Sequence, residues 1–440
     1  MKDLLFKRVS IAPLITFRVI FGGMMLGSVI RFWLKGWIEE LYLQPQFHFT
    51  YYGFEWVKPL GEYGMYLLFL SMAVAAFFIM VGFLYHYAAF VFFLAFTYVE
   101  LIDLTTYLNH YYFVSLVSLL MIFVPANKAY SVDAMLKPKN RAKRIPFWAI
   151  GAIRLQLAIV YFYAGIAKLH PDWLLEAQPL RIWLAAHTDM PYIGFLFKYT
   201  WVAYFFSWFG AIYDLTIPFF LINRKTRPFA YLAVIAFHVM TAMLFPIGMF
   251  PYIMILSTLI FFSADFHEKI WGNVKFAAAK NPLENTDNIA NIVMTLLLAV
   301  FFTFQLIFPF RYALYPGNLF WTEQGFRFSW RVMLMEKAGH ITFYVENPEN
   351  GNRVEIVNSD YLTPLQEKMM ATQPDMILQF AHHLTAIYQE KGIEKPKVYA
   401  KCYVTLNGRP SKPFIDPTVN LAEEYDSFAN KGWILPMEAE

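Results

Sequence analysis

Long apolar runs constrain this chain more than any other feature, because they recur through its first 310 residues. A helix needs about 20 apolar residues to cross the roughly 30 Å hydrocarbon core of a bilayer. Hydrophobic residues make up 58% of the 440 residues and charged residues only 15%, whereas soluble domains carry about 25% charged residues. The sequence therefore predicts a polytopic membrane protein and excludes a disordered chain.

Nine segments are apolar enough to be spans, so we expect an all-α polytopic membrane helical bundle over residues 1–310. The expected number of spans is about nine, with eight as the alternative, because several segments are short or carry polar residues. The segments are Ile11–Phe32, Gly64–Leu84, Ala88–Leu104, Tyr111–Pro125, Phe147–Leu169, Trp201–Ile222, Phe229–Phe245, Met249–Ser263 and Ile289–Phe310.

The chain changes character after the last span, which predicts a small extramembrane α+β domain over residues 311–440. Ile341–Glu346 and Arg353–Val357 alternate between apolar and polar residues around a turn-forming segment, which is typical of a β-hairpin. Tyr361–Gln389 predicts one or two amphipathic helices, and Lys397–Leu406 predicts another strand.

Basic residues in the connecting segments predict the orientation. Cytoplasmic loops carry an excess of Lys and Arg, and an N-terminus inside gives fifteen such residues inside and four outside. The inside residues are Lys2, Lys7, Arg8, Lys128, Lys137, Lys139, Arg141, Lys143, Arg144, Arg224, Lys225, Arg227, Lys269, Lys275 and Lys280. The outside residues are Lys35, Lys58, Arg181 and Lys198. Nine spans then place the C-terminal domain on the exoplasmic side, and the net charge of only +4 gives no reason to expect nucleic acid as a partner.

Ionisable residues inside the predicted spans need a partner or a function, because each costs several kcal/mol in a bilayer. The simplest interpretation makes Arg18, Arg154 and Asp214 partners in structural ion pairs. Glu100 and Asp103 fall near an outer boundary, so we expect them to be solvated.

Lys168 allows two interpretations. It lies at the outer end of the fifth predicted span and precedes Pro171, which stops the helix. A lysine there commonly extends its amine to the interface. Alternatively, an apolar aromatic pocket disfavours the ammonium ion, so that the free amine can act as a base near neutral pH.

His110 and the turn around Gly248 also remain open to two interpretations. His110 follows Asn109, and the two can form a structural hydrogen-bond pair or hold a phenol or quinol oxygen. His238 precedes a Pro-Ile-Gly-Met-Phe-Pro segment whose irregular backbone fits either a cavity lining or a plain re-entrant turn. The scattered histidines form no metal signature, and the sequence carries no nucleotide-binding motif.

These motifs together resemble the vitamin K-dependent γ-glutamyl carboxylase family, within the wider HTTM group of membrane proteins. The similarity extends over nearly the whole chain, and the ordered set is more specific than any single piece. The matching segments are 17–22, 109–110, 131–133, 153–156, 160–173, 213–216, 237–238, 245–252, 326–330 and 414–417.

The resemblance implies a reaction in which reduced vitamin K, O2, CO2 and peptidyl glutamate give γ-carboxyglutamate and vitamin K epoxide, without a metal. It implies that Lys168 is the catalytic base and that His110 and Asn109 orient the quinol and stabilise its oxyanion. The partners it implies are a lipid-soluble quinol and a glutamate-containing protein or peptide. We expect the cofactor to be bound by Tyr161, Arg154, His238, Gly248, Met249, Phe250, Trp330 and Met333.

Three departures accompany the resemblance. Animal members carry a second lysine where Ala167 stands, they have a disulfide that the one cysteine here, Cys402, forbids, and they are longer at the C-terminus. The shorter chain and the missing disulfide resemble a bacterial member, whose outer side faces the periplasm. The alternatives are a quinol epoxidase without carboxylation and a non-catalytic quinone-binding protein or transporter.

Overall fold

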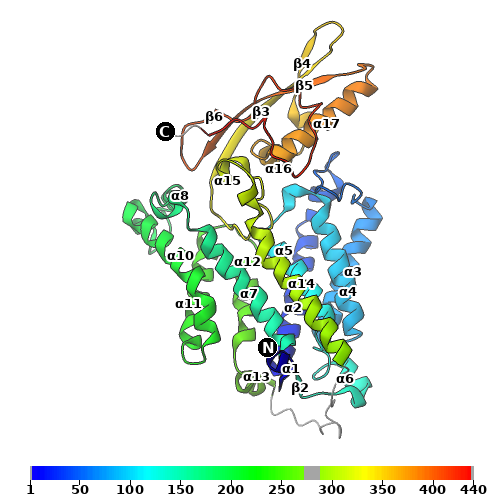
Figure 1. Cartoon of the computed structure of the whole chain (residues 1–440), viewed down its shortest axis with the longest axis vertical. Helices are drawn as coiled ribbons and strands as arrows, with labels where there is room; N and C mark the ends of the chain where they lie inside the picture. The colour runs from blue at the N-terminus through cyan, green and yellow to red at the C-terminus, as the bar shows by residue number, and fades with distance from the viewer. Residues whose placement is uncertain (1, 272–287, 438–440) are drawn as a thin grey trace.

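The computed structural model describes residues 2–271 and 288–437, and it consists of a helical bundle with a sheet domain at one end (Figure 1). Lys275 and Lys280, which contributed to the predicted orientation, lie outside the described residues. Short elements at the inner end and in the loops are α1 (Lys2–Phe6), β1 (Arg8–Ser10), α6 (Val132–Leu136), β2 (Arg144–Pro146), α8 (Pro171–Leu174) and α9 (Leu180–Ala185).

Among the described residues, seven helices are long and apolar enough to cross a membrane. They are α2 (Ala12–Leu34), α3 (Gly61–Val81), α4 (Tyr85–Ile102), α7 (Trp148–Ala167), α10 (Thr200–Ile222), α11 (Arg227–Leu244) and α14 (Asn288–Ile307). The chain is therefore an integral membrane protein, and the predicted fold class is confirmed.

The two remaining predicted spans are helical but differ from a simple crossing. α5 (Asn109–Phe123) has only 15 residues. α12 (Phe250–Ser257) continues as a 3-10 turn to Phe261, and α13 (Ala264–Trp271) then leaves at an angle of 108°. An eighth span exists only if this bent pair is counted as one.

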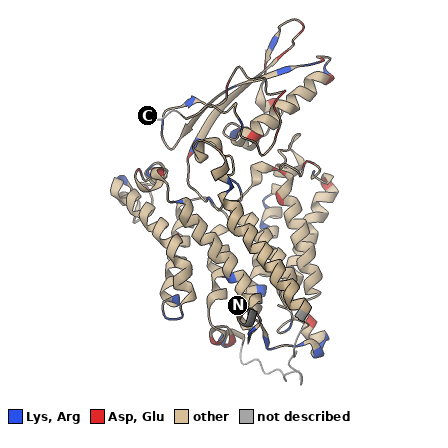
Figure 2. Ribbon diagram, in the orientation of Figure 1, with Lys and Arg blue, Asp and Glu red and all other residues tan. Residues whose placement is uncertain are grey.

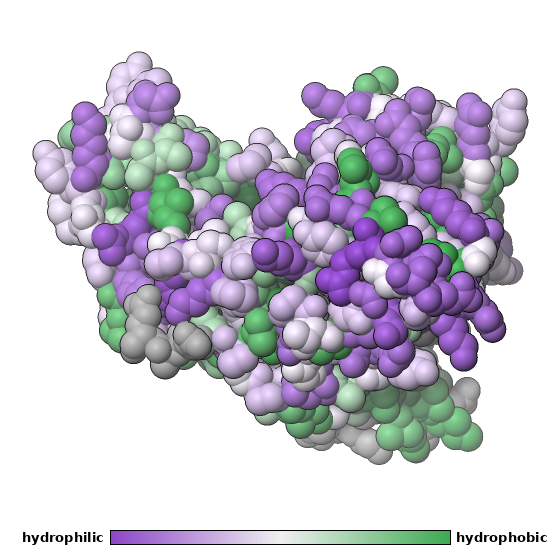
Figure 3. All heavy atoms as spheres, turned by 90° about the horizontal axis from the view of Figure 1, so that it is seen from above, coloured by the Kyte–Doolittle hydropathy of each residue, from purple (hydrophilic) through white to green (hydrophobic). Residues whose placement is uncertain are grey.

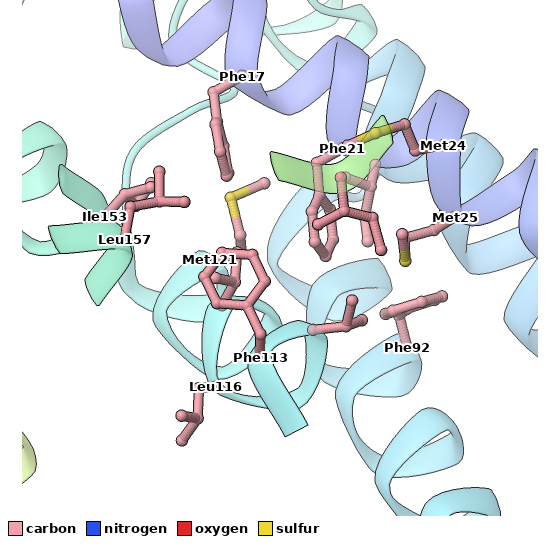
Figure 4. Close-up of a cluster of buried hydrophobic side chains, with 14 of the residues drawn as sticks. Phe17, Phe21, Met24, Met25, Phe92, Phe113, Leu116, Met121, Ile153 and Leu157 are labelled. Atoms are coloured by element: carbon pink, nitrogen blue, oxygen red, sulfur yellow. The ribbon is translucent and has the colours of Figure 1, made fainter. Parts of the chain in front are cut away.

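The core of the bundle lies where α2, α4, α5 and α7 meet. Figure 4 shows aromatic rings and methionine side chains from these helices converging on one another. Gly22 lets α2 and α3 approach closely, because a Cβ there would lie 2.5 Å from the backbone nitrogen of Met80. Tight packing of this kind is one of the interactions that hold helices together in a bilayer.

Buried charged side chains in the bundle correct the sequence expectations for four residues. Arg18 donates to the carbonyl oxygens of Ala126 and Tyr130, and Arg154 donates to that of Ile260 at 2.8 Å. Backbone carbonyl oxygens therefore accept hydrogen bonds from both arginines, although Arg18 Nε is buried without a hydrogen-bond partner among the described residues. The expected ion pairs of these two residues are wrong.

The expectation that Glu100 and Asp103 are solvated is also wrong, because their exposed fractions are only 6% and 1%. Ser115 Oγ donates to Glu100 at 2.7 Å. Asp103 is covered by the sheet domain, called the outer domain from here on. Gln366 of this domain donates to Asp103 at 3.1 Å.

The outer domain is a four-stranded antiparallel sheet with the strand order β4-β3-β5-β6. Ile341, Phe343 and Val345 of β3 are buried at alternate positions, and Phe343 packs against Phe380 of α17. The predicted hairpin, second strand and helix pair are all confirmed. The elements are α15 (Leu319–Thr322), β3 (Lys337–Glu346), β4 (Arg353–Glu355), α16 (Pro364–Met370), α17 (Pro374–Glu390), β5 (Lys397–Leu406) and β6 (Lys412–Pro413).

The N-terminus lies at the end of the bundle opposite the sheet domain (Figure 1). Figure 2 shows charged residues mostly at the two ends of the bundle and in the outer domain, with few between them. Seen from above, the outer face is largely hydrophilic (Figure 3). This distribution matches a bundle in lipid that carries a water-facing domain.

Candidate active site

A cavity of about 300 Å³, here called the inner cavity, lies among α7, α10, α11 and α12. Its lining is mainly aliphatic and aromatic, and its polar groups come from a few side chains. The residues that line it and are used below are Tyr161, Ala164, Lys168, Trp173, Phe205, Phe209, Gly210, Asp214, His238, Phe250 and Met333. Such a cavity suits an apolar ring that is oriented by a small number of polar contacts.

Lys168 places its amine at the inner cavity rather than outward at the membrane interface. Its exposed fraction is 6%, and Nζ donates to Asp214 Oδ2 at 2.7 Å and to the Ala164 carbonyl at 3.3 Å. Nζ also lies 5.5 Å from the centroid of the Trp173 ring. Lys168 is therefore a buried, ion-paired lysine beside a cavity.

Gly165 makes this arrangement possible. A Cβ on Gly165 of α7 would lie 2.7 Å from the backbone nitrogen of Leu215, so only glycine lets α7 approach α10 this closely. Gly210 lies against the lysine stem, where a Cβ would make an ordinary contact of 3.8 Å with Lys168 Cε. Packing between α7 and α10, which are far apart in the sequence, thus sets the position of the ion pair.

His238 and Tyr161 form a second polar group at the inner cavity. His238 is 1% exposed, and its Nδ1 lies 2.9 Å from the Val234 carbonyl oxygen. Because a carbonyl oxygen only accepts, Nδ1 carries the proton and Nε2 of the neutral ring is an acceptor. Tyr161 packs edge-on against this ring at 6.0 Å, and its hydroxyl lies 3.4 Å from Thr258 Oγ1.

A second cavity of about 860 Å³, here called the outer cavity, lies between the bundle and the outer domain. Its bundle side includes Arg31, Asn109, His110, Gly248 and Met249. Its outer-domain side is charged and includes Glu323, Arg327, Glu336, Lys337 and Lys368. This cavity can hold a polar, charged ligand that the inner cavity would exclude.

The cations of the outer cavity differ in their partners. Arg327 pairs with Asp375, and Lys337 pairs with Glu323 at 2.8 Å. Burial lowers the pKa of Lys337 even though Glu323 acts in the opposite direction. Arg31 and Lys368 have no carboxylate partner among the described residues, so they leave positive charge at this cavity.

The two cavities share part of their lining. Ile247, Phe250, Val332 and Met333 contribute to both, and we call these four residues the dividing wall. The Phe250 ring lies 5.9 Å from that of His110 and 5.8 Å from that of His238. Gly248, with φ of 60°, provides the left-handed turn that leads into this wall.

Val332 and Met333, the other two residues of the dividing wall, belong to a segment with a strained backbone. Phe328, Trp330 and Met333 all have positive φ, which is uncommon for bulky residues and requires support from their surroundings. Asn109 Nδ2 supplies part of it by donating to the Arg331 carbonyl at 2.8 Å. Non-glycine strain held in this way is concentrated at functional sites.

A polar contact joins the Lys168 loop to the outer domain. Asp172 accepts from Arg409 at 2.8 and 2.9 Å and from Asn407 at 2.7 Å. Burial alone would raise the pKa of Asp172, but the hydrogen bonds from Arg409 and Asn407 outweigh it and lower that pKa. The next residue, Trp173, donates from Nε1 to the Ser207 carbonyl of α10 at 2.8 Å. The loop after Lys168 is therefore held from two sides.

Comparison with known families decides the relationship. Residues 6–266 match the family described as HTTM domain, and residues 290–440 match the one described as vitamin K-dependent gamma-carboxylase, lumenal domain. The chain belongs to the vitamin K-dependent gamma-carboxylase family. No solved structure matches the chain.

Membership in the gamma-carboxylase family fixes several coarse properties. It indicates a carboxylase that uses vitamin K, and the lumenal label indicates an exoplasmic C-terminal domain. Within residues 2–271 and 288–437, no group of three or more His, Cys, Asp and Glu side chains could hold a metal ion.

The structure divides the site residues predicted from the sequence into four groups. Lys168, Tyr161 and His238 line the inner cavity, and Asn109, His110, Gly248 and Met249 line the outer cavity. Phe250 and Met333 line both. Arg154 and Trp330 line neither: the first is bonded to backbone carbonyls, and the second is fully buried in a stack with Tyr112.

Sequence reasoning missed two features of this candidate site. Asp214 was considered only as a structural partner, whereas it lines the inner cavity beside Lys168. Arg31 was counted as part of a span, whereas it reaches the outer cavity. A charged residue near the end of an apolar run is the signal that could have identified Arg31.

Proposed function

We propose that this protein is a vitamin K-dependent γ-carboxylase that couples oxygenation of vitamin K hydroquinone to its epoxide with carboxylation of peptidyl glutamate. The observation that carries the proposal is the buried Lys168 amine, which lies in an apolar cavity and is separated from a charged cavity by a shared wall. One compartment suits a lipid-soluble ring and the other suits an acidic peptide side chain.

The inner cavity fits the quinol by its chemistry. Aromatic side chains surround the space, and polar groups are confined to a few positions around Lys168, Asp214 and His238. Phe205 and Phe209 line the cavity and are also 57% and 43% exposed on the bundle surface. An isoprenoid tail can therefore leave between apolar side chains toward lipid.

Lys168, together with the Asp214 carboxylate paired to it, is the site we assign to accept the proton of the quinol hydroxyl. A phenol has a pKa of about 10, so a base held in this site has only a weak acid to deprotonate. The bound hydroquinone supplies, together with O2, the strong base that removal of a glutamate γ-hydrogen requires. The Lys168 site, fixed by α7 and α10, has only to take the first proton and hold it.

The outer cavity is where we place the glutamate and the CO2 that adds to it. Arg31 and Lys368 can attract the substrate carboxylate, because unpaired positive charge in a cleft raises the local concentration of an anionic ligand. The Glu336 carboxylate at the same cavity acts against this attraction, and the Glu323 carboxylate is paired with Lys337. His110 and Asn109 are assigned to orient the reacting oxygen at the wall by hydrogen bonds. The dividing wall keeps water from the inner cavity, where water would quench a strong base.

Topology supports placing the N-terminus in the cytoplasm. The structure puts the N-terminus at the bundle end opposite the outer domain (Figure 1), and the basic loops favour that end as the inner side. The glutamate substrate would then be an exported protein or peptide.

The test uses purified full-length protein in lipid nanodiscs with reduced vitamin K, labelled CO2 and a glutamate-containing peptide. We expect both vitamin K epoxide and carboxylated peptide by mass spectrometry. Lys168→Ala should lose both products while it keeps a monodisperse elution profile. Epoxide without carboxylated peptide would favour the quinol epoxidase, and the absence of both products would favour a binding or transport protein.

A further inference from the structure

We infer that Lys168 and Asp214 act as one proton-accepting pair, in which the Asp214 carboxylate allows the pair to take up the proton of the quinol. The inference deepens the proposed function and rests on it. It assigns a positioning and proton-holding role to a residue of α10 that lies 46 positions from the lysine in the sequence.

The geometry makes the two side chains a single unit. Their nitrogen and oxygen atoms are 2.7 Å apart, and their side chains are only 7% and 6% exposed. The close contact between Gly165 and Leu215 fixes the spacing of the two helices that carry them. Neither group can therefore turn into water to change its protonation independently.

A free amine is not what this arrangement favours. A lone lysine in an apolar cavity would lose its proton readily, because desolvation disfavours the charged form. A carboxylate at 2.7 Å acts in the opposite direction, since an opposite charge favours the ammonium ion. Groups coupled this strongly gain and lose protons as a pair rather than as separate residues.

The proton balance follows from this pairing. At rest the pair is neutral overall, because the charge of the Lys168 ammonium ion balances that of the Asp214 carboxylate. When the O–H bond of the quinol hydroxyl breaks, its proton goes to the pair, which becomes an ammonium ion beside a carboxylic acid. The pair gains one positive charge as the quinol oxygen gains one negative charge, so the local charge stays balanced without water.

The pair differs from the neighbouring polar groups by its charge. His238 of α11 uses Nδ1 to contact the Val234 carbonyl and keeps Nε2 as a neutral acceptor, and the hydroxyl of Tyr161 of α7 lies near Thr258. Tyr213 of α10 stacks against Phe237 at 4.3 Å. Among the described residues that line the inner cavity, Lys168 and Asp214 form the only salt bridge.

The decisive variant is Asp214→Asn, because the two mechanisms predict opposite results. If Lys168 acted as an independent free amine, removal of the carboxylate would help it lose its proton, and activity would be retained or would rise. If the pair is the base, kcat for epoxide formation should fall at least 100-fold, in line with loss of general base catalysis. The KM for quinol should change less than about 3-fold.

Two further variants complete the test on the full-length protein in nanodiscs. Asp214→Glu keeps the carboxylate and should retain kcat within about 10-fold of the unmodified protein. Glu100→Gln is the matched control, since Glu100 is also a buried carboxyl group but lines neither cavity. It should leave both products unchanged.

The outcomes separate this inference from the proposed function. A folded Asp214→Asn variant with full activity would overturn the pair and leave the γ-carboxylase function intact. If Asp214→Asn fails to fold, Asp214→Glu decides, and a folded but inactive Asp214→Glu variant would overturn the pair. Failure of the unmodified protein to form epoxide and carboxylated peptide would instead contradict the proposed function itself.

Discussion

The inner and outer cavities share a wall but differ in nearly every other respect. The inner one has about 300 Å³ lined by apolar and aromatic side chains around a single salt bridge, and the outer one has about 860 Å³ with charged groups from both domains. In the proposed function this difference assigns the lipid-soluble ring to one side of the dividing wall and the charged peptide to the other, so the two can react only at that wall. Four predictions test this division.

The largest effect should come from filling the inner cavity. Gly210→Phe would place a ring next to Lys168 Cε, so we expect the formation of both products to fall more than 100-fold through loss of quinol binding. Gly210→Ala is the control, because its Cβ would lie 3.8 Å from the nearest atoms and should be tolerated. Normal quinol turnover in a folded Gly210→Phe variant would show that the quinol binds elsewhere.

A smaller loss is expected on the outer side of the wall. His110→Ala should lower carboxylation about 100-fold, the scale of lost acid–base or hydrogen-bond assistance, with little change in the KM for quinol. His187→Ala, outside both cavities, is the control. If His110→Ala unfolds the protein instead of lowering the rate of carboxylation, the role of the histidine is structural.

The next effect concerns the charge of the outer cavity. Arg31→Ala should raise the KM for the glutamate peptide about 10-fold, the size of one lost hydrogen bond to a charged group, and should leave the KM for quinol unchanged. Lys35→Ala removes a nearby exposed charge that lines neither cavity. Equal effects of the two variants would indicate general electrostatic attraction and no specific contact.

The smallest effect on catalysis should come from the contact that joins the domains. Arg409→Ala leaves Asp172 buried without its main partner, so we expect the outer domain to lose roughly 3 kcal/mol of stability. Because the folded pKa of Asp172 is lowered, its stabilising contribution is present above the ordinary carboxylate pKa of about 4 and is lost as pH falls through the folded value.

Cys402 offers a direct measurement of that loss. The thiol is 2% exposed in β5, and burial raises its pKa to about 12, so it should react with a thiol-specific dye only after the outer domain unfolds. The unmodified protein should unfold at lower temperature on acidification below about pH 4, and Arg409→Ala should show little of this pH dependence. Identical acid sensitivity in both proteins would remove Asp172 as the cause.

Hydropathy and alternation were enough to predict the helical segments and the outer hairpin, because both depend on residues that are close in the sequence. Lys168 could be singled out from its motif and its position before Pro171. Its partner could not, because Asp214 meets it only after α7 and α10 pack through Gly165. Asp103 was misjudged for a similar reason, since Gln366, which covers it, comes from a different domain.

The presence of one cysteine has a practical consequence for how this protein can be handled. A hydroquinone survives in air only under reducing conditions, and thiol reductants would open a disulfide that joined the two parts of the chain. Here hydrogen bonds and the Asp172–Arg409 salt bridge make that connection, and Cys402 is free and buried. Thiol reductants that keep the quinol cosubstrate reduced should therefore leave the stability of the fold unchanged.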